Sequence, residues 1–390
     1  MDDMSLCDQL EIDRTSTTPL HLQVERGIRH FILKNNVEPG SLIPSAMEIS
    51  KSLSINHWTV RKAMKSLESQ NILSVIPARG AFVTEDAHVQ RVLWVTGPDQ
   101  SMNDVSPTYS NLMRLAAKEA VKHQIRMEPV WLTVGMDEEI KAFIRTTSLS
   151  HYAGAIFHDC GPEHLLLHEV AKAGLPYVCI RPSGIARPFT VSHDNKGCAV
   201  MAMEYLKSRG HQDVLIVRFD DWPAGTDLDD LQGHIEQTTR RTGLNPINCL
   251  LPRNRTCIAH VVNDAKRAVS EFIARYGRVP SAVYMSDDIV ARGVCLALID
   301  YCARRGVTDL EVYVRCSVEN IVPLGMPVTY MTMSAAEEVH AALELLTIQM
   351  AGQFPADPHR VISYRMLPSE QAPAMPEDPI KFVGMLSPAQ

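Results

Sequence analysis

Long apolar runs are missing from this sequence. The most apolar windows, such as residues 214–217, are short and bounded by charged residues. None approaches the roughly 20 apolar residues that a membrane-spanning helix needs. Residues 1–14 are acidic and lack a positively charged stretch followed by an apolar one, which argues against a secretory signal peptide. We therefore expect no membrane partner and a cytoplasmic location.

Cysteine pairs at metal-binding or redox spacing are also missing. The nine cysteines are scattered without a Cys-x-x-Cys pair. The closest, Cys249 with Cys257 and Cys295 with Cys302, have no His/Cys set at zinc spacing nearby. An odd number of cysteines in apolar segments is typical of buried free thiols in a reducing compartment. We predict no metal ligands, and a structural disulfide is the weaker alternative.

Motifs of the common enzyme classes are absent too. No Gly-x-Ser-x-Gly, His-Glu-x-x-His or P-loop pattern occurs. His158, Asp159 and Cys160 carry suitable side chains for a catalytic cluster, but adjacent residues at a strand end do not converge in space as a triad must. We predict no catalytic residues and no cofactor.

Charge is distributed unevenly along the chain. The 390 residues carry a net charge of −7, and 45% of them are hydrophobic, which is typical of a globular protein of two or three domains. Between Thr15 and Thr84, however, eight basic residues stand against four acidic ones. The basic residues are Arg26, Arg29, Lys34, Lys51, Arg61, Lys62, Lys65 and Arg79. A basic segment on an acidic protein is typical of a module that binds a polyanion.

Residues 18–86 have the pattern of a small helical domain with a hairpin. The expected elements are a helix over 18–35, a second helix with a Ser45–Glu48 capping box, a third helix over 58–70 and a β-hairpin over 75–83. Thr18 is the expected cap of the first helix and Pro19 its first residue. This order predicts a winged helix-turn-helix (α+β) that binds double-stranded DNA, after a flexible arm at 1–17.

The third helix is expected to enter the major groove with its N-terminal residues leading. The basic hairpin tip can reach a phosphate or the minor groove. The candidate DNA-binding residues are Ser45, His57, Trp58, Thr59, Arg61, Lys62 and Arg79. The alternative is a helical bundle whose basic face binds nothing.

Three motifs in this domain resemble the GntR family of regulators. Gly-Ser-Leu-Ile-Pro-Ser at 40–45 is similar to that family's Gly-x-x-Leu-Pro-Ser turn. Residues 55–64 resemble its Val-Ser-x-x-Thr-Val-Arg-x-Ala-Leu recognition helix, and Arg-Gly-Ala-Phe-Val at 79–83 resembles its wing. The resemblance implies a DNA-binding regulator, with Thr59 and Arg61 as its matching DNA contacts.

Three positions depart from the family pattern. Met47 stands where the family usually has a DNA-contacting arginine, His57 where another basic residue is common, and Ala78 where the wing has its first glycine. These changes imply an unusual operator or weaker binding. Some GntR-type regulators carry a pyridoxal-phosphate enzyme domain, but no convincing lysine and phosphate-binding arrangement occurs here.

From Arg91 onward, predicted strands and helices alternate. One set runs through residues 92–180 and a second through 196–314. Such alternation implies parallel sheets with crossover helices, and two sets imply two α/β lobes. Ligands of such folds bind at the carboxyl ends of the strands, so we expect a cleft between the lobes.

This second region resembles the LacI-type sensor domain, which is related to periplasmic sugar-binding proteins. The resemblance rests on Val-Ser-His-Asp-Asn-Lys-Gly at 191–197, on Val-Pro-Ser-Ala-Val at 279–283 and on Asp-Ile-Val-Ala-Arg-Gly at 288–293. It implies a two-lobed periplasmic-binding-protein-like effector domain over residues 87–370, with a tail at 371–390.

The same resemblance implies boundaries for the lobes. The first lobe is expected at about 90–190 and 318–350, and the second at about 191–317 and 351–370. The chain would then cross between the lobes near Asp194, near 318–327 and near Ala351, and these crossings would form a hinge.

The ligand-binding residues follow from the resemblance position by position. Asp288 matches an aspartate that accepts hydrogen bonds from sugar hydroxyls, a role that suits a carboxylate. Tyr109 lies where an aromatic residue stacks on the sugar. The candidate ligand-binding residues are Asp288, Tyr109, Asp194, Trp222 and Asp230. The alternatives are that Asp288 caps a helix and that Tyr109 and Trp222 are core aromatics.

Two departures imply altered pocket chemistry. Asp230 stands where the family commonly has an arginine, and Arg181-Pro182 replaces the usual Asp-Arg pair. The expected function is a homodimeric regulator, a repressor by default, that binds a pseudo-palindromic operator under the control of a small effector, expected to be a sugar or sugar derivative. The alternatives are a constitutive DNA-binding dimer with a degenerate sensor and a sensor of a non-sugar metabolite.

Overall fold

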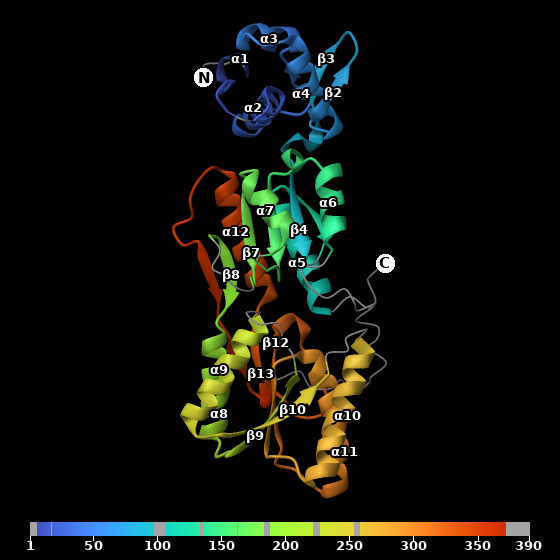
Figure 1. The fold of residues 1–390 in the computed structure, drawn as a ribbon, viewed down its shortest axis with the longest axis vertical. Helices are drawn as coiled ribbons and strands as arrows, with labels where there is room; N and C mark the ends of the chain where they lie inside the picture. The colour runs from blue at the N-terminus through green and yellow to red at the C-terminus, as the bar shows by residue number, and fades with distance from the viewer. Residues whose placement is uncertain are drawn as a thin grey trace. The chain divides into compact units, whose positions relative to one another are not determined.

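The structure is a computed structural model that describes residues 6–16, 18–96, 107–132, 136–161, 163–182, 188–220, 227–252 and 258–371 (Figure 1). The chain divides into two compact units. One holds residues 1–93, 120–128 and 143–154, and the other holds the remainder. None of the helices in the described ranges combines the length and the apolar character needed to cross a bilayer.

The N-terminal domain is the predicted winged helix-turn-helix. Its elements are α1 (Leu6–Gln9), α2 (Leu20–Lys34), β1 (Leu42–Ile43), α3 (Ala46–Leu53), α4 (His57–Ser69), β2 (Leu73–Ile76) and β3 (Gly80–Val83). The strands form an antiparallel sheet in the order β1-β3-β2. Apolar side chains of α2, α3 and α4, such as Ile28, Ile49 and Leu67, are fully buried in one core.

Capping residues that can be recognised in the sequence begin α3 and α4, whereas α2 begins without a side-chain cap. Ser45 accepts a hydrogen bond from the Glu48 amide, and the Glu48 carboxylate accepts one from the Ser45 amide, so the predicted capping box is confirmed. The prediction for α2 was wrong, because Pro19 has an extended ψ of 137° and is the residue before the helix. No side chain caps α2.

Part of the predicted flexible arm is ordered. Leu6 and Leu10, one helical turn apart, are buried in the core of the N-terminal domain. Gly27 permits this contact, since a Cβ atom there would lie 2.3 Å from a Leu10 methyl carbon. The prediction of a flexible arm was wrong for these residues. Two apolar residues four positions apart are too few to indicate a helix in the sequence.

The first α/β sheet has the strand order β14-β8-β7-β6-β4-β5. Its strands are β4 (Gln90–Thr96), β5 (Ile125–Trp131), β6 (Gly154–His158), β7 (Tyr177–Ile180), β8 (Thr190–His193) and β14 (His359–Ile362). The helices in this part are α5 (Pro107–Lys122), α6 (Asp137–Thr146), α7 (Leu165–Lys172) and α12 (Ala335–Met350), and α12 packs on β7 and β8. Short 3-10 turns occupy Glu85–His88 and Leu149–His151.

The second sheet has the order β10-β9-β11-β12-β13-β15. Its strands are β9 (Asp213–Phe219), β10 (Asn245–Leu251), β11 (Ala282–Met285), β12 (Glu311–Ser317), β13 (Thr329–Met333) and β15 (Arg365–Leu367). Its helices are α8 (Asn195–Ser208), α9 (Asp227–Thr242), α10 (Ile258–Tyr276) and α11 (Asp288–Arg305). The strands are parallel except β15, which pairs antiparallel with β13. The prediction of two parallel α/β lobes is therefore confirmed.

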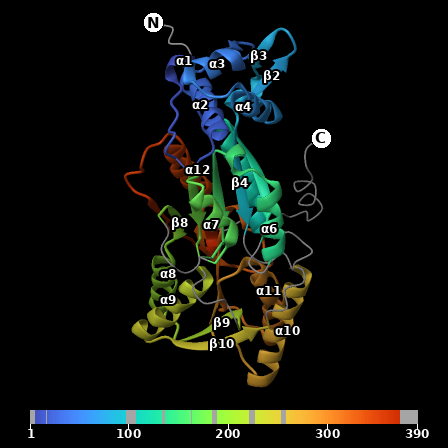
Figure 2. The ribbon, with the colours of Figure 1, turned by 45° about the horizontal axis from the view of Figure 1, so that its top comes forward.

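Helix pairs cover the second sheet. Figure 1 and Figure 2 both show α8 beside α9 and α10 beside α11. Gly293 in α11 allows the close approach to α10, because a Cβ atom there would lie 2.1 Å from the Val262 carbonyl oxygen. Only glycine fits this contact without displacing backbone.

Three segments carry the chain between the two sheets, and two of them differ from the prediction. The first lies at Asp194, between β8 and α8, as expected. The second lies at Ser334, because β13 extends the second sheet before the chain enters α12. The third lies between Ile362 and Arg365, because β14 pairs with β8 of the first sheet. Residues 318–333 thus belong to the second lobe and 351–362 to the first, the reverse of the expected boundaries.

Candidate functional site

Helix α4 presents one apolar and one basic face. Its apolar residues Val60, Ala63, Met64 and Leu67 are buried against the rest of the N-terminal domain. The exposed side chains on the opposite face are Trp58, three basic residues (Arg61, Lys62 and Lys65) and, further along, Glu68. The predicted contact residues of α4 therefore fall on or beside one accessible surface, with His57 and Thr59 half-buried at its edge.

The first turn of α4 is held in a defined arrangement. The Asn56 side chain accepts a hydrogen bond of 2.8 Å from the Trp58 amide. The Arg61 guanidinium lies 5.2 Å from the centre of the Trp58 ring, and the His57 ring meets that indole edge-on at 5.8 Å. Arg61 and Lys62 form no ion pair with another described residue. Their charge is thus not neutralised within the described protein.

The remaining DNA-binding candidates lie on α3 and the wing. Ser45 is exposed but its oxygen serves the α3 cap. Arg79 is exposed at the β2–β3 turn, where its amide donates to the Ile76 carbonyl oxygen at 3.0 Å. Ala78, which replaces the family's glycine, has φ of 61°. A residue with a Cβ atom in this left-handed region costs about 1–2 kcal/mol.

In the second unit, charged residues gather where neighbouring strands of the first sheet end. Asp159 follows β6, Arg181 follows β7 and His193 ends β8. Arg181 Nε lies 3.3 Å from Asp159 Oδ1 and 3.4 Å from Glu338 Oε1 on α12. Asp159 and Arg181 both have positive φ, 53° and 48°. Such strain at non-glycine residues persists only where surrounding contacts impose it, and it is concentrated at functional sites.

Tyr109 joins this group from α5. Its hydroxyl donates to Asp159 Oδ2 at 2.8 Å, and its ring packs edge-on against His158 at 5.2 Å. Arg181 also hydrogen-bonds His158. Tyr109 is half-buried with its hydroxyl in a polar network, so it is not a simple core aromatic.

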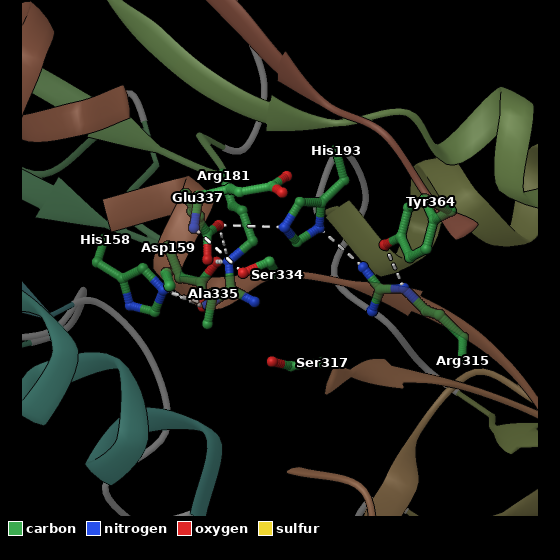
Figure 3. Close-up of polar contacts among 12 residues, drawn as sticks. His158, Asp159, Arg181, His193, Arg315, Ser317, Ser334, Ala335, Glu337 and Tyr364 are labelled. Atoms are coloured by element: carbon green, nitrogen blue, oxygen red, sulfur yellow. Dashed lines mark hydrogen bonds and ion pairs between the residues drawn. The ribbon is translucent and has the colours of Figure 1, made fainter. Parts of the chain in front are cut away.

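The network continues across to the second lobe (Figure 3). His193 Nε2 lies 3.1 Å from Glu338 Oε1, and His193 Nδ1 lies 2.9 Å from Arg315 Nη2 on β12. Arg315 Nε donates to the Tyr364 hydroxyl at 2.7 Å. Arginine can only donate, so His193 Nδ1 accepts and the imidazole proton is on Nε2, the nitrogen that lies nearer Glu338. We call these seven residues the polar row, namely Tyr109, Asp159, Arg181, Glu338, His193, Arg315 and Tyr364.

Glu338 is the buried anion of the polar row. Its side chain is 1% exposed. Burial alone would raise the pKa of Glu338, but the nearby Arg181 and His193 hold that pKa below its ordinary value. The carboxylate is therefore charged and helps to hold Arg181 and His193, which both contact it, in place.

Asp288 lies in the second lobe at the start of α11. The cap of α11 is Asp287, whose carboxylate accepts from the Ile289 and Val290 amides at 2.8 and 3.0 Å, so the capping alternative for Asp288 was wrong. The Asp288 side chain is 16% exposed and lies 3.9 Å from Arg292. Its Oδ2 has no hydrogen-bond partner among the described residues. Burial, and then the Asp287 charge, raise the pKa of Asp288 to about 7.

The other predicted ligand residues lie elsewhere. Asp194 caps α8 by accepting from the Gly197 amide at 2.8 Å, and its own amide donates to the Ile362 carbonyl oxygen, so it joins two of the crossing segments. Asp230 is exposed on α9 and accepts from the Asn195 side chain at 3.0 Å. It borders an open polar cavity of about 550 Å³. Trp222 lies outside the described residues.

The sequence interpretation missed most of the polar row. His158 and Asp159 were noted only as an unconvincing catalytic cluster, and Arg181 only as a departure. Burial raises the pKa of the neighbouring Cys160 thiol well above its ordinary value, so that cysteine is no nucleophile. A charged residue directly after a buried parallel strand is a signal that could have found two members of the row, Asp159 and Arg181. No cluster of metal-ligating side chains occurs in the ranges that the structure describes.

Comparison with known proteins identifies the class of the N-terminal domain. Residues 20–83 match the family described as bacterial regulatory proteins, gntR family. Over 78 residues, 20% of this chain, it is 33% identical to the HTH-type transcriptional repressor YtrA of Bacillus subtilis (strain 168). Over 120 residues, 29% of this chain, it is 26% identical to the mannosyl-D-glycerate transport/metabolism system repressor MngR of Escherichia coli (strain K12). The chain spans 60% and 50% of these relatives' lengths.

Solved structures identify the fold of the rest. A LacI-family regulatory protein from Chloroflexus aggregans superposes with a TM-score of 0.56 at 17% identity, covering 70% of this chain and 96% of that one. A LacI-family regulator from Arthrobacter sp. FB24 in complex with lactose gives 0.56 at 14% identity, covering 73% and 100%. At this identity the likeness establishes the fold alone.

The protein thus combines two recognisable parts. Its N-terminal domain is a GntR-family helix-turn-helix, and the remainder has the periplasmic-binding-protein-like fold of LacI-type sensor domains. YtrA and MngR are named as repressors, and the two LacI-family neighbours are named as regulators.

Proposed function

We propose that this protein is a transcriptional repressor whose affinity for an operator is controlled by a small effector bound between the two lobes. The proposal rests on one observation, that a GntR-type domain with an exposed basic α4 and a two-lobed sensor fold occur in one chain. The relatives YtrA and MngR are named as repressors, which supports the direction of control. Such a role places the protein in the cytoplasm, where the chromosome is.

We further propose that the protein acts as a homodimer on a pseudo-palindromic operator. Two-fold symmetry lets the dimer present two copies of α4, one from each chain, to successive major grooves. Trp58, Thr59, Arg61 and Lys62 would contact the DNA from α4, and Arg79 from the wing. His57 and Ser45 lie at the margin of this surface.

The proposed effector is a sugar or sugar derivative, with Asp288 and Tyr109 among its contacts. A buried carboxyl group with an unused acceptor oxygen suits a hydroxyl-rich ligand, because an unpaired buried polar atom is costly. Lactose and fructose 1-phosphate are bound in two structural neighbours, a LacI-family regulator and Cra of Pseudomonas putida. Asp194 and Asp230 have contacts within the protein that favour structural roles, and they are the weaker candidates.

The polar row offers a physical route for control. It joins groups of the first lobe, such as Asp159 and Glu338, to Arg315 of the second. A ligand with different affinities for two lobe arrangements shifts their populations by that difference. Breaking the contact between His193 and Arg315 would favour a second arrangement.

Thermal unfolding of the full chain with a panel of mono- and disaccharides and sugar phosphates tests this function. An effector at a hundred times its dissociation constant stabilises the native state by about 2.7 kcal/mol. The shift should disappear in Asp288→Asn. Asp300→Asn is a matched control, since Asp300 lies on the same helix with an arginine four residues on but is 62% exposed.

A parallel measurement of binding to genomic duplex fragments separates the alternatives. DNA binding that a hit weakens would support an effector-released repressor. DNA binding without any thermal shift would favour a non-sugar effector or a constitutive dimer. Both alternatives are supported by Arg181 and Asp230, which replace two residues of the family's pocket. No DNA binding would refute the regulator proposal itself.

A further inference from the structure

Trp58 exposes a large apolar surface at the start of α4, on a face whose nearest charged residues are basic. It exposes 68% of its surface in the first turn of α4. Burying an indole ring is among the largest stabilising contributions a single side chain can make. This ring contributes little of that to the fold, so its surface remains available for a partner.

The indole ring is also held in position. Its backbone amide is fixed by the Asn56 cap, Arg61 lies over its face, and His57 touches its edge. An arginine three residues on and a lysine four residues on lie on the same face of a helix. A preorganised aromatic ring loses less side-chain entropy when it binds than a freely rotating one.

The surroundings of the ring indicate the chemistry of the partner. The first turn of α4 has no acidic residue. Trp58 shares its face with Arg61, Lys62 and Lys65, none of which has an ion-pair partner among the described residues. An apolar protein surface would have to desolvate these cations, whereas a DNA groove supplies phosphates for them.

We propose that Trp58 is a specificity-determining residue that reads a thymine of the operator through its 5-methyl group. This inference rests on the proposed DNA-binding function and goes beyond it by naming the base. In the major groove, the thymine methyl is the apolar group on the base edges, and apolar side chains read it by contact. The ring of Trp58 covers this methyl, while Arg61 and His57 fix its orientation.

The test uses duplexes that the full-length protein selects from a random pool. Each thymine of a selected duplex is replaced in turn by deoxyuridine, which removes the 5-methyl group and leaves the base pair intact. Wild-type protein should lose about fourfold in affinity at one thymine per half-site, the amount expected for one buried methyl-sized group. Other thymines should show no loss.

The Trp58→Ala variant completes the comparison. It should bind the unmodified duplex more weakly and show no further loss at the sensitive thymine, while Trp58→Phe retains part of the sensitivity. Val121→Ala is the control, because Val121 is 73% exposed on α5, outside the DNA-binding domain, and this variant should behave as wild type. Thermal unfolding verifies that each variant is folded.

Two results would overturn the inference. One is wild-type binding that is insensitive to every single methyl removal. The other is a Trp58→Ala variant that keeps the wild-type loss at the same thymine. Failure of the wild-type protein to select any duplex would instead refute the proposed function, and this inference with it.

Discussion

The charged residues of α4 and those of the polar row have opposite surroundings. On α4, Arg61 and Lys62 are exposed and have no ion-pair partner among the described residues. In the polar row, Arg181 and Glu338 are largely buried and contact each other, and Glu338 also contacts His193. The first arrangement leaves charge for an outside polyanion. The polar row neutralises its charges internally. Its effect on the protein therefore depends on how its side chains are arranged and not on net charge.

Removing the buried anion should have the largest effect. Glu338→Gln leaves Arg181 and His193 without their shared carboxylate, and breaking a buried pair typically costs about 3–5 kcal/mol. We expect that loss in the free energy of unfolding in urea at pH 7. Glu337→Gln, next to it on α12 but half-exposed, should change little.

The Glu338 effect should depend on pH in a defined direction. Its folded-state pKa is lowered, so its stabilisation is present above the unfolded pKa of about 4.3 and is lost as pH falls through the folded value. The difference between wild type and Glu338→Gln should therefore shrink in acid. A difference that stays constant down to pH 2 would contradict the assigned charge.

Asp288 contrasts with Glu338, because it is also buried but one of its carboxylate oxygens has no hydrogen-bond partner among the described residues. Its pKa of about 7 means that ionisation costs folding energy as pH rises from about 4 to 7. Asp288→Asn should be more stable than wild type at pH 8, by roughly 2–4 kcal/mol. Denaturant unfolding at pH 5 and pH 8 measures this. An Asp288→Asn variant that is less stable than wild type at pH 8 would contradict the raised pKa of Asp288.

Met47→Arg should strengthen the basic face. Met47 is 63% exposed on α3, so an arginine there can reach a phosphate without repacking. We expect several-fold tighter binding of duplex DNA at low salt and a salt dependence steeper by about 0.9 per added phosphate contact. Met47→Gln, which adds no charge, is the control. Equal effects of both variants would remove the electrostatic explanation.

Ala78→Gly should give the smallest change. Relief of the left-handed backbone, about 1–2 kcal/mol, is partly offset by the greater freedom of glycine in the unfolded chain, which leaves about 0.5–1 kcal/mol of stabilisation. Hydrogen exchange of the β2–β3 amides reports it. Ala274→Gly, exposed in the last turn of α10, should instead destabilise, by up to about 0.5–1 kcal/mol.

Features that depend on neighbours in sequence were predictable, and those that depend on distant pairing were not. The Ser45–Glu48 cap and the alternation of strands and helices both follow from residues that are close together in the sequence. The crossing at Ser334 could not be read from the sequence, because β13 has apolar residues that suit either sheet. Sheet membership is decided by which strand it meets, here β12.

The same distinction explains the candidate sites. The exposed face of α4 follows from helical periodicity, so Trp58 and Arg61 were identified. Glu338 is a charged residue on α12 directly after the exposed Glu337, and its burial follows from its contacts with Arg181 and His193. Asp288 was identified through the family resemblance. That it does not cap α11 became clear only from the structure, in which Asp287 is the cap.

The last strands of the chain have a consequence for its synthesis. β14 forms the edge of the first sheet and β15 the edge of the second, and they are separated by two residues. Neither sheet has its full set of strands until residues 359–367 have left the ribosome. The N-terminal domain, complete by residue 83, can fold far earlier. A nascent chain therefore has its helix-turn-helix before either of its α/β lobes is complete.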